Sequence, residues 1–492
     1  MPDRPQLDRR AFLGLGGATL AAAGLAACSP VPGATPNPTS PTGWVPPVEP
    51  MAFPAGYTWG AATSAFQVEG STTVDGRGQS IWDVFCAQPG RVQRGATGDP
   101  GADVYRLWEG DLDLMSGLGL DAYRFSVSWP RIQPEGSGAV NQKGVDWYRR
   151  FVDGLRERGI RPGITLFHWD LPQTLQDAGG WPARDTAARF ADYAEIVFDA
   201  LGGDGELAAD WFTLNEPKTL AYVGHWYGGH APGLSDPDLA VAAVHHQLLG
   251  HGLAVERFRA AGTPGRIGIA LNLIPVYPVL GGEKSAERVD AAENRLFLDA
   301  VLLGSYPDDA IGAGPGSVPA DPEKFLDLIH DGDLETISTP CDLLAVQYYG
   351  VTGVNSAGDQ VRIHETTNAT WQQVWPEGLY DLLRRLKDDY PRIPLVITEN
   401  GMPDESAQLT VDDPYRVEFL RAHFQQAARA IADGVPLEAH YVWSLLDNFE
   451  WAEGYQQRWG IVAVDFDTQE RTLKKSAEFF REVIAANAVP AA

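Results

Sequence analysis

Two glutamates, Glu216 and Glu399, each closely follow a short apolar run of the kind that forms a buried strand. Paired carboxylates on opposite sides of a pocket can divide acid–base work. One protonates a leaving oxygen, while the other attacks the adjacent carbon or activates a water, which is the chemistry of glycosidic bond cleavage. A separation of about 5–5.5 Å permits direct attack with retention, and about 6.5–9.5 Å gives inversion. The sequence does not determine the separation of the two carboxyl groups.

The residues that flank the two glutamates restrict the backbone around them. Pro217 disfavours the helical region for the residue before it, so we expect Glu216 to be extended. Gly401, two residues after Glu399, is expected to let the chain turn sharply. Both glutamates are therefore predicted to stand at strand ends.

The elements that would position these carboxylates form a regular alternation. Asp146–Arg158 and Ala187–Leu201 have the apolar spacing of amphipathic helices. Strands that alternate with helices pair in parallel, which predicts a single α/β domain built as a (β/α)8 TIM barrel with extended loops; a doubly wound sheet is the alternative. The predicted strands are Tyr57–Thr63, Ala122–Val127, Gly163–Trp169, Trp211–Leu214, Ile267–Leu273, Leu343–Tyr349, Leu395–Thr398 and Ala439–Leu445.

Polar and aromatic residues collect at the carboxyl ends of these predicted strands, where barrel enzymes carry their sites. They form six motifs in a fixed order: Trp59–Gly70, Tyr123–Ser126, His168–Pro172, Thr213–Pro217, Ile397–Gly401 and Asp447–Trp451. In order and spacing, the chain from about residue 53 to residue 483 resembles glycoside hydrolase family 1, the β-glucosidase family. The resemblance implies a retaining, exo-acting β-glycosidase that works through a covalent glycosyl-enzyme and needs no cofactor.

The resemblance also implies roles for individual residues. Glu216 is the expected acid/base and Glu399 the expected nucleophile, with Arg124 and Tyr349 holding Glu399 ionised. The expected substrate-binding residues are Gln67, His168, Trp169, Asn215, Glu450 and Trp451, with Trp443 as the floor beneath the sugar. The negative charge of Glu399 should raise the pKa of Glu216, so that Glu216 can act as an acid near neutral pH.

Several positions bear on the substrate and on metals. Gln347 stands where the family usually has Asn. Trp371 lies one residue further from Pro376 than the usual aglycone-side Trp, so Trp375 is an alternative for that place. Between Trp451 and Trp459 there is no Lys, which predicts an unphosphorylated sugar. The histidines lack a metal-ligand spacing, and we expect His245, His246 and His251 to be hydrogen-bonded polar groups of one helix.

Composition excludes other functions. The 492 residues carry a net charge of −27 without a basic run, which argues against nucleic acid as a partner. Cys86 and Cys341 are expected to be reduced, buried thiols in place of a disulfide.

The first fifty residues differ in character from the rest. Asp8–Leu13 contains a twin arginine, and a short Gly/Ala-rich apolar stretch leads to the lipobox-like Leu25–Cys28. We expect a twin-arginine lipoprotein signal over residues 1–28, a Pro/Thr/Gly-rich tether over 29–50 and the catalytic domain over 51–488. Lipid on Cys28 would attach the protein to the outer side of a bacterial cell membrane; simple secretion is the alternative.

Two other functions remain open at this point. A transglycosylating enzyme would use the same covalent intermediate with a sugar acceptor in place of water. A surface glycan-binding lipoprotein on a degenerate barrel would bind without turnover, but such degeneration usually removes a carboxylate, and both Glu216 and Glu399 are present.

Overall fold

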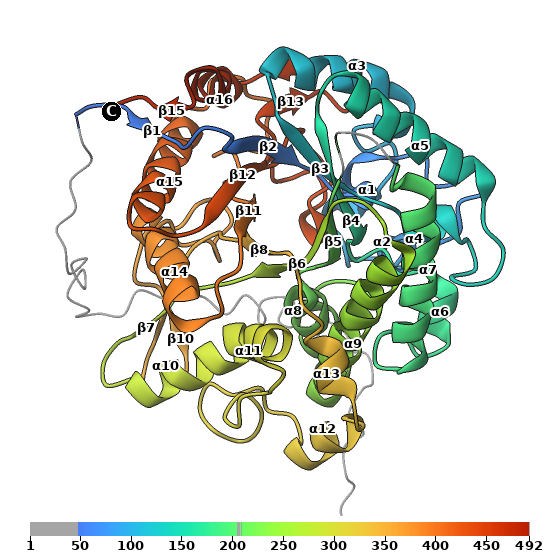
Figure 1. Cartoon of the computed structure of the whole chain (residues 1–492), viewed down its shortest axis with the longest axis vertical. Coiled ribbons are helices and arrows are strands. Elements are labelled where there is room, and N and C mark those ends of the chain that lie inside the picture. The colour runs from blue at the N-terminus through green and yellow to red at the C-terminus, as the bar shows by residue number, and fades with distance from the viewer. Residues whose placement is uncertain (1–47, 204–206, 208, 492) are drawn as a thin grey trace, which may run out of the picture.

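The computed structural model describes residues 48–203, 207 and 209–491. Within these residues eight parallel strands close into a barrel in the spatial order β11-β12-β2-β3-β4-β5-β6-β8 (Figure 1). The strands are β2 (Thr58–Ala62), β3 (Ala122–Ser126), β4 (Arg161–Phe167), β5 (Asp210–Asn215), β6 (Arg266–Asn272), β8 (Leu343–Gln347), β11 (Leu395–Glu399) and β12 (Leu437–Trp443).

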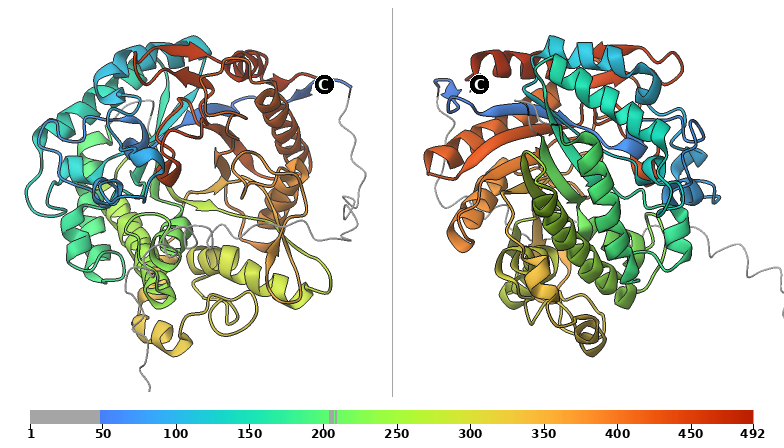
Figure 2. Two further views of the ribbon diagram at one scale, coloured as in Figure 1. Left: turned by 180° about the vertical axis from the view of Figure 1, so that it is seen from behind. Right: turned by 45° about the vertical axis from the view of Figure 1, so that its right-hand side comes forward.

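Helices surround the barrel on its outside (Figures 1 and 2). Neighbours pack in sequence, α3 on α5, α5 on α7 and α7 on α9, and then α14 on α15, α15 on α16 and α16 back on α3. The longest helices are α3 (Val104–Leu118), α5 (Gln142–Glu157), α7 (Asp185–Leu201), α9 (Pro237–Ala261), α14 (Pro376–Asp389), α15 (Pro414–Ala432) and α16 (Lys475–Ala486), and α11 (Leu296–Leu303) is shorter.

These elements confirm the predicted architecture. Each predicted strand matches an observed one to within two residues at either end. The closed sheet excludes the doubly wound alternative, because that fold has two open edges. The predicted helix from Asp146 begins four residues earlier in the structure, at Gln142.

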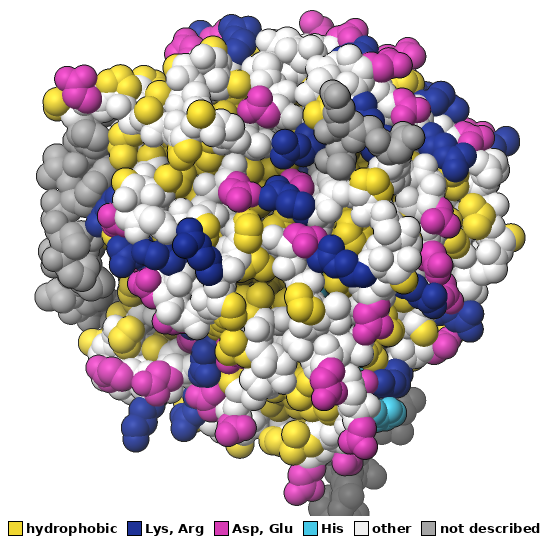
Figure 3. All heavy atoms as spheres, viewed as in Figure 1, with side chains coloured by type: hydrophobic (Ala, Val, Ile, Leu, Met, Phe, Trp, Pro, Cys, Tyr) yellow, Lys and Arg dark blue, Asp and Glu magenta, His cyan; other side chains and the backbone are white. Residues whose placement is uncertain are grey.

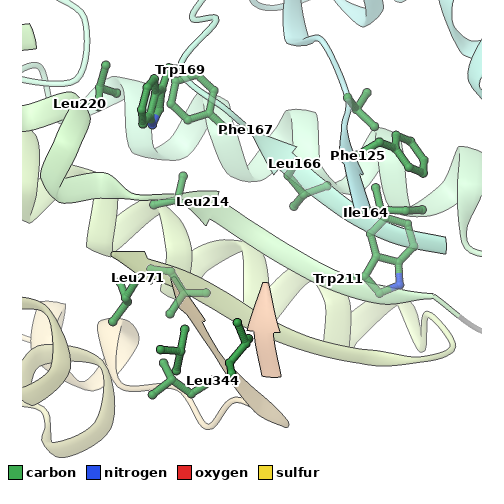
Figure 4. Close-up of a cluster of buried hydrophobic side chains, with 14 of the residues drawn as sticks. Phe125, Ile164, Leu166, Phe167, Trp169, Trp211, Leu214, Leu220, Leu271 and Leu344 are labelled. Carbon is green, nitrogen blue, oxygen red and sulfur yellow. The ribbon is translucent and has the colours of Figure 1, made fainter. Parts of the chain in front are cut away.

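The barrel has two hydrophobic layers. Small residues such as Ala62 and Ala270 fill its interior together with the larger rings of Phe212 and Tyr441. A Cβ on Gly60 would lie 2.4 Å from the Tyr441 ring, so this strand position admits glycine alone. Outside, strand and helix side chains interdigitate in a continuous core; Figure 4 shows one part of it, where Phe125, Ile164, Leu166 and Trp211 are among the labelled residues.

Short elements line the loops that join strands to helices. The short helices are α1 (Ala65–Val68), α2 (Ile81–Cys86), α4 (Trp129–Ile132), α6 (Gln173–Asp177), α8 (Pro217–Thr219), α10 (Glu283–Asp290), α12 (Pro322–Leu328) and α13 (Asp333–Ile337), with 3₁₀ or π turns at Gln93–Gly95, Leu220–Trp226, Ala291–Arg295 and Trp451–Glu453. The small strands are β1 (Met51–Ala52), β7 (Val276–Pro278), β9 (Thr352–Val354), β10 (Gln360–Val361), β13 (Val462–Val464), β14 (Arg471–Leu473) and β15 (Ala488–Val489). β1 pairs antiparallel with β15, which brings the two ends of the described chain together.

The predicted export signal, Cys28 and nearly all of the tether lie outside the described residues. In the part that the structure describes, no helix is long and apolar enough to span a bilayer. Cys86 and Cys341 are both free thiols, as expected, although Cys341 is only partly buried. On the face seen in Figure 3, Lys and Arg side chains are interspersed with Asp and Glu.

Candidate active site

Glu399 is the last residue of β11, and its carboxylate accepts three hydrogen bonds. Arg124 Nη1 donates to Oε1 at 2.6 Å, and Gln347 Nε2 donates to the same oxygen at 2.7 Å. Tyr349 donates its hydroxyl to Oε2 at 2.6 Å. The structure therefore brings together the carboxylate and the two residues, Arg124 and Tyr349, that were predicted to hold it.

Arg124 is fully buried inside the barrel, and the surrounding residues compensate for its charge. It forms an ion pair with Glu399, and its guanidinium carbon lies 5.4 Å from the centroid of the Phe212 ring. A cation over an aromatic face gains electrostatic stabilisation in a dry interior. Because arginine stays protonated at all ordinary pH values, it supplies a permanent positive charge beside Glu399.

Asn215, the last residue of β5, is fixed on both sides of its amide. Its Oδ1 accepts from Arg124 Nη2 at 2.5 Å and from Gln347 Nε2 at 2.7 Å. Its Nδ2 lies 3.0 Å from His168 Nε2. Its backbone carbonyl accepts from the Trp169 indole N–H at 2.8 Å. One hydrogen of Nδ2 is left for another acceptor.

Glu216 follows β5 and is the N-cap of the short helix α8. Its backbone is left-handed, with φ 45° and ψ 64°, so the extended conformation expected from Pro217 is wrong. Proline disfavours the right-handed helical region before it, and here the chain has moved to the left-handed region instead. A non-glycine residue in that region is strained, and such strain concentrates at functional sites. Thr219 donates its hydroxyl to Glu216 Oε2 at 2.7 Å.

Burial raises the pKa of both glutamates, but different groups surround their carboxyls. Burial, and secondly the charge of Glu399, raise the pKa of Glu216 to about 8. Burial raises the pKa of Glu399 as well, and it outweighs the lowering by Arg124 and by the Tyr349 hydroxyl. Glu399 therefore has a cation and two neutral donors on its carboxylate, and Glu216 has a single hydroxyl. The expected influence of Glu399 on Glu216 is present, but burial is the larger cause.

A third carboxyl group, Glu450, lies within reach of the charges of both glutamates. Glu450 Oε2 is 3.4 Å from Gln67 Nε2, which also donates to Asn448 Oδ1 and to the Phe449 carbonyl at 3.0 Å each. Burial, with the charge of Glu399 next, raises the pKa of Glu450 to about 8. Gln67 and Glu450 thus come together as predicted, from the short helix α1 after β2 and from the loop after β12.

Aromatic rings complete the site. His168 lies between Trp443 and Trp451, with ring centroids 5.9 Å and 6.0 Å away and nearly parallel planes. Trp169 packs on Trp451 at 4.6 Å. Burial holds the pKa of His168 well below its ordinary value, so the imidazole is neutral. The structure therefore gathers all the predicted sugar-site residues into one region.

Gly401 is required for a different reason than expected. The structure gives it no left-handed φ, so it does not make the sharp turn predicted after Glu399. A Cβ at this position would lie 1.8 Å from the carbonyl oxygen of Trp443. The glycine therefore allows the chain just after β11 to approach the end of β12 closely beside the site.

Of the two candidate tryptophans for the outer wall, Trp371 is the one at the site. It is 46% exposed. It stacks on Trp459 at 6.1 Å and meets the Tyr349 ring edge-on at 5.8 Å. Trp375 instead stacks on His364 at 3.9 Å.

The described residues contain no cluster of His, Cys, Asp and Glu that could hold a metal ion. His245 contacts Tyr306 and Asp333, His246 lies near the Trp181 carbonyl and His251 near Thr213. All three are buried on α9, as expected of hydrogen-bonded polar groups.

Two buried glutamates follow β5 and end β11 of this closed barrel, and the charge of one reaches the other, which is the arrangement of a glycosidase that works by two carboxyl groups. The glycosyl hydrolase family 1 model matches residues 49–489, and the chain belongs to this family, whose members are retaining glycosidases.

Characterised relatives cover nearly the whole domain. β-Glucosidase A of Acetivibrio thermocellus is 44% identical over 457 residues, which are 89% of this chain and 99% of that protein. Thermostable β-glucosidase B of Thermobispora bispora is 46% identical over 89% of this chain and 91% of its own length. The structure of a β-glucosidase from Thermotoga maritima in complex with glucoimidazole is 41% identical, covers 89% of this chain and 99% of its own, and superposes with a TM-score of 0.82.

Sequence reasoning missed three residues of the site. Thr219 had a usable signal, because it lies three residues after Glu216 at the start of a helix. Asn448, which orients Gln67, lies inside a recognised motif. Trp459 had no signal, since its contact with Trp371 depends on two separate loops.

Proposed function

We propose that this retaining glycosidase hydrolyses unphosphorylated β-glucosides or short β-linked oligosaccharides from one end, with Glu399 as nucleophile and Glu216 as acid/base. The observation that supports this assignment is that the two carboxyl groups have different surroundings. Glu399 is paired with Arg124, while Glu216 is buried with a pKa of about 8. The β-glucosidase relatives support glucose as the sugar.

In the first step an oxygen of Glu399 forms a bond to the anomeric carbon, and the bond from that carbon to the aglycone oxygen breaks. Glu216 transfers its proton to the departing oxygen. Because the pKa of Glu216 is about 8, the group is protonated at neutral pH and can give its proton in the transition state.

In the second step water attacks the anomeric carbon and the bond to Glu399 breaks, which returns the carboxylate. Glu216, now ionised, takes a proton from that water. While Glu399 is esterified it carries no charge, so one of the two causes that raise the pKa of Glu216 is absent. The same residue can then serve as a base, and the two inversions give net retention.

The polar residues near the two glutamates support a neutral sugar. Gln67 and Glu450 offer both donors and acceptors, which suits adjacent hydroxyls. A sugar phosphate would meet the Glu450 carboxyl without a cation from the following segment, since residues 452–458 contain no Lys and the Arg458 guanidinium is paired with Asp447.

A panel of nitrophenyl glycosides tests this proposal with the purified protein. We expect release from β-glucosides, none from α-glucosides and little from 6-phospho-β-glucosides. Proton NMR of the first product should show the β-anomer before it mutarotates. Release of the α-anomer first, or no turnover of any β-glycoside, would refute the proposal.

We propose in addition that lipid on Cys28 holds the enzyme at the outer side of the cell membrane, after export by the twin-arginine route. The support is the order of a twin arginine, a short apolar stretch and Leu25–Cys28 in front of a Pro-rich tether. Cys28→Ser should move the protein from the membrane fraction to the soluble fraction. A variant that stays in the membrane fraction would exclude lipid on Cys28.

A further inference from the structure

Gln347, the last residue of β8, makes contacts that the mechanism above does not use. Its Nε2 lies 2.7 Å from Glu399 Oε1 and 2.7 Å from Asn215 Oδ1. An amide nitrogen has two hydrogens, so each acceptor can receive one. A single side chain thus links β5, β8 and β11 at the level of the reacting groups.

The orientation of this amide follows from its neighbours. Arg124 can only donate, and it contacts the same two atoms, so both must be acceptors. A flipped Gln347 would place its oxygen against two oxygens. In the observed orientation Gln347 Oε1 is buried without a hydrogen-bond partner among the described residues. The oxygen of Gln347 therefore accepts no hydrogen bond, and the side chain acts at this site as a hydrogen-bond donor.

We propose that Gln347 is a positioning residue that couples the nucleophile to the group recognising the neighbouring sugar hydroxyl. Because both acceptor positions of its oxygen are occupied, Asn215 is held with one hydrogen of Nδ2 facing His168 and the second free for a sugar hydroxyl. The second hydrogen of Gln347 stabilises the anionic form of Glu399. This inference rests on the proposed function, together with the sugar-binding role that the family resemblance implies for Asn215, which we take to be a contact with the sugar 2-hydroxyl.

The length of the side chain is part of the proposal. Asn at this position would withdraw the amide by about 1.5 Å, one carbon–carbon bond, so it would lose contact with at least one of its two acceptors. Gln347→Met keeps a similar shape but removes both donors. Gln347→Glu keeps the shape and places a carboxyl oxygen against Glu399.

Two measurements separate positioning from a merely structural role. Gln347→Met should lower kcat/KM about 10- to 100-fold on a nitrophenyl β-glucoside, because the lost hydrogen bonds involve a charged acceptor. The loss should be at least threefold smaller on the 2-deoxy-β-glucoside, which offers Asn215 no hydroxyl.

The acid limb of the kcat/KM profile should also move to higher pH, by about one unit for Gln347→Met and further for Gln347→Glu, since a donor to Glu399 is lost. The charged or titratable groups that face Glu399 are Arg124, Tyr349, Glu216 and Glu450, and none of them is altered in these variants.

Thr165→Val is the matched control. Thr165 is buried on β4 with a hydroxyl that has no partner in the described structure, so its loss should change neither readout. Melting temperatures identify variants that fail to fold. Gln347→Asn keeps an amide with a shorter reach, so its losses should lie between those of the wild type and those of Gln347→Met.

Equal losses on the two substrates, or an acid limb that does not move, would overturn the proposal for Gln347. A wild-type enzyme that hydrolyses neither glucoside would instead refute the proposed function. Full activity of Gln347→Met beside an active wild type refutes only the role of Gln347.

Discussion

Removing the charge of Glu399 should lower the pKa of Glu216 without returning it to an ordinary value. The pKa of Glu216 is raised from 4.5 to about 8, by burial first and by the charge of Glu399 second. Glu399→Gln keeps the shape of the side chain and deletes the charge. It therefore separates the two causes.

The expected size follows from Coulomb's law. In a retaining enzyme the two carboxyls lie about 5.5 Å apart, and an effective dielectric constant of about 20 gives an interaction of about 3 kcal/mol. One pKa unit corresponds to about 1.4 kcal/mol, so the charge accounts for at most about 2 units. We expect the pKa of Glu216 to fall to between about 6 and about 7 in Glu399→Gln, because burial remains.

Carbon-13 NMR of labelled glutamate can measure this pKa, with Glu399→Gln/Glu216→Gln as the reference that identifies the signal. A pKa that stays at about 8 would show that the Glu399 charge does not reach Glu216. A fall to about 4.5 would show that burial is not the larger cause. In the wild type, kcat/KM should decline above about pH 8 as Glu216 loses its proton.

Four further variants test other parts of the site. Glu399→Ala should lose at least about 10⁴-fold in kcat, and azide should partly restore turnover and give an α-glucosyl azide; unaided turnover at the wild-type rate would contradict the nucleophile assignment. Glu216→Ala should lose far more activity on alkyl than on dinitrophenyl glucosides, because an activated leaving group needs little protonation; equal losses would count against the acid role. Trp371→Ala should raise KM several-fold for substrates with a large aglycone and leave kcat nearly unchanged; a change confined to kcat would refute a binding role. Burial raises the pKa of the Asp170 carboxyl to about 8, although Ser128 and Arg77 act against the shift. The stability gained from burying the protonated carboxyl is therefore complete below about pH 4 and is lost as the pH rises to about 8. Denaturant unfolding of Asp170→Asn should therefore lose a pH dependence of about 1.4 kcal/mol per unit in that window, and an unchanged slope would argue against it.

The strands could be predicted from the sequence because each is a short, nearly continuous apolar run. A strand buried on both faces of a parallel sheet leaves that signature with little dependence on its surroundings. The first turn of α5 was missed because Gln142–Val145 begins with polar residues and a glycine, outside the apolar stripe. Helix ends depend on capping and packing, which the apolar period does not record.

The residues of the site could be predicted from the sequence, but the hydrogen bonds between them could not. Strand ends in a parallel barrel share one face, so Arg124, Asn215 and Glu399 were expected to be neighbours. Their hydrogen bonds depend on strand register. Gln347, for example, reaches Asn215 across 132 residues of sequence. The left-handed backbone of Glu216 is a choice between two allowed regions, and local sequence did not decide it.

The loops that carry the site are tied together by a buried ionic network. Three cations and three carboxylates alternate in it, namely Lys474, Arg416, Arg458, Asp404, Asp413 and Asp447. Lys474 Nζ lies 2.8 Å from both Asp404 and Asp447. Equal numbers of opposite charges explain how an acidic chain keeps six ionisable groups away from water, since each has an opposite partner in contact.

This network connects the two sides of the reaction. Asp404 lies five residues after Glu399, and Asp447 lies three residues before Glu450, so Lys474 joins the loop after the proposed nucleophile to the loop that carries Glu450. Removing one member leaves a buried charge unpaired, at a cost of about 3–5 kcal/mol, whereas a change at the surface of either loop does not. A single cation near the C-terminus thus ties together the two loops that follow β11 and β12.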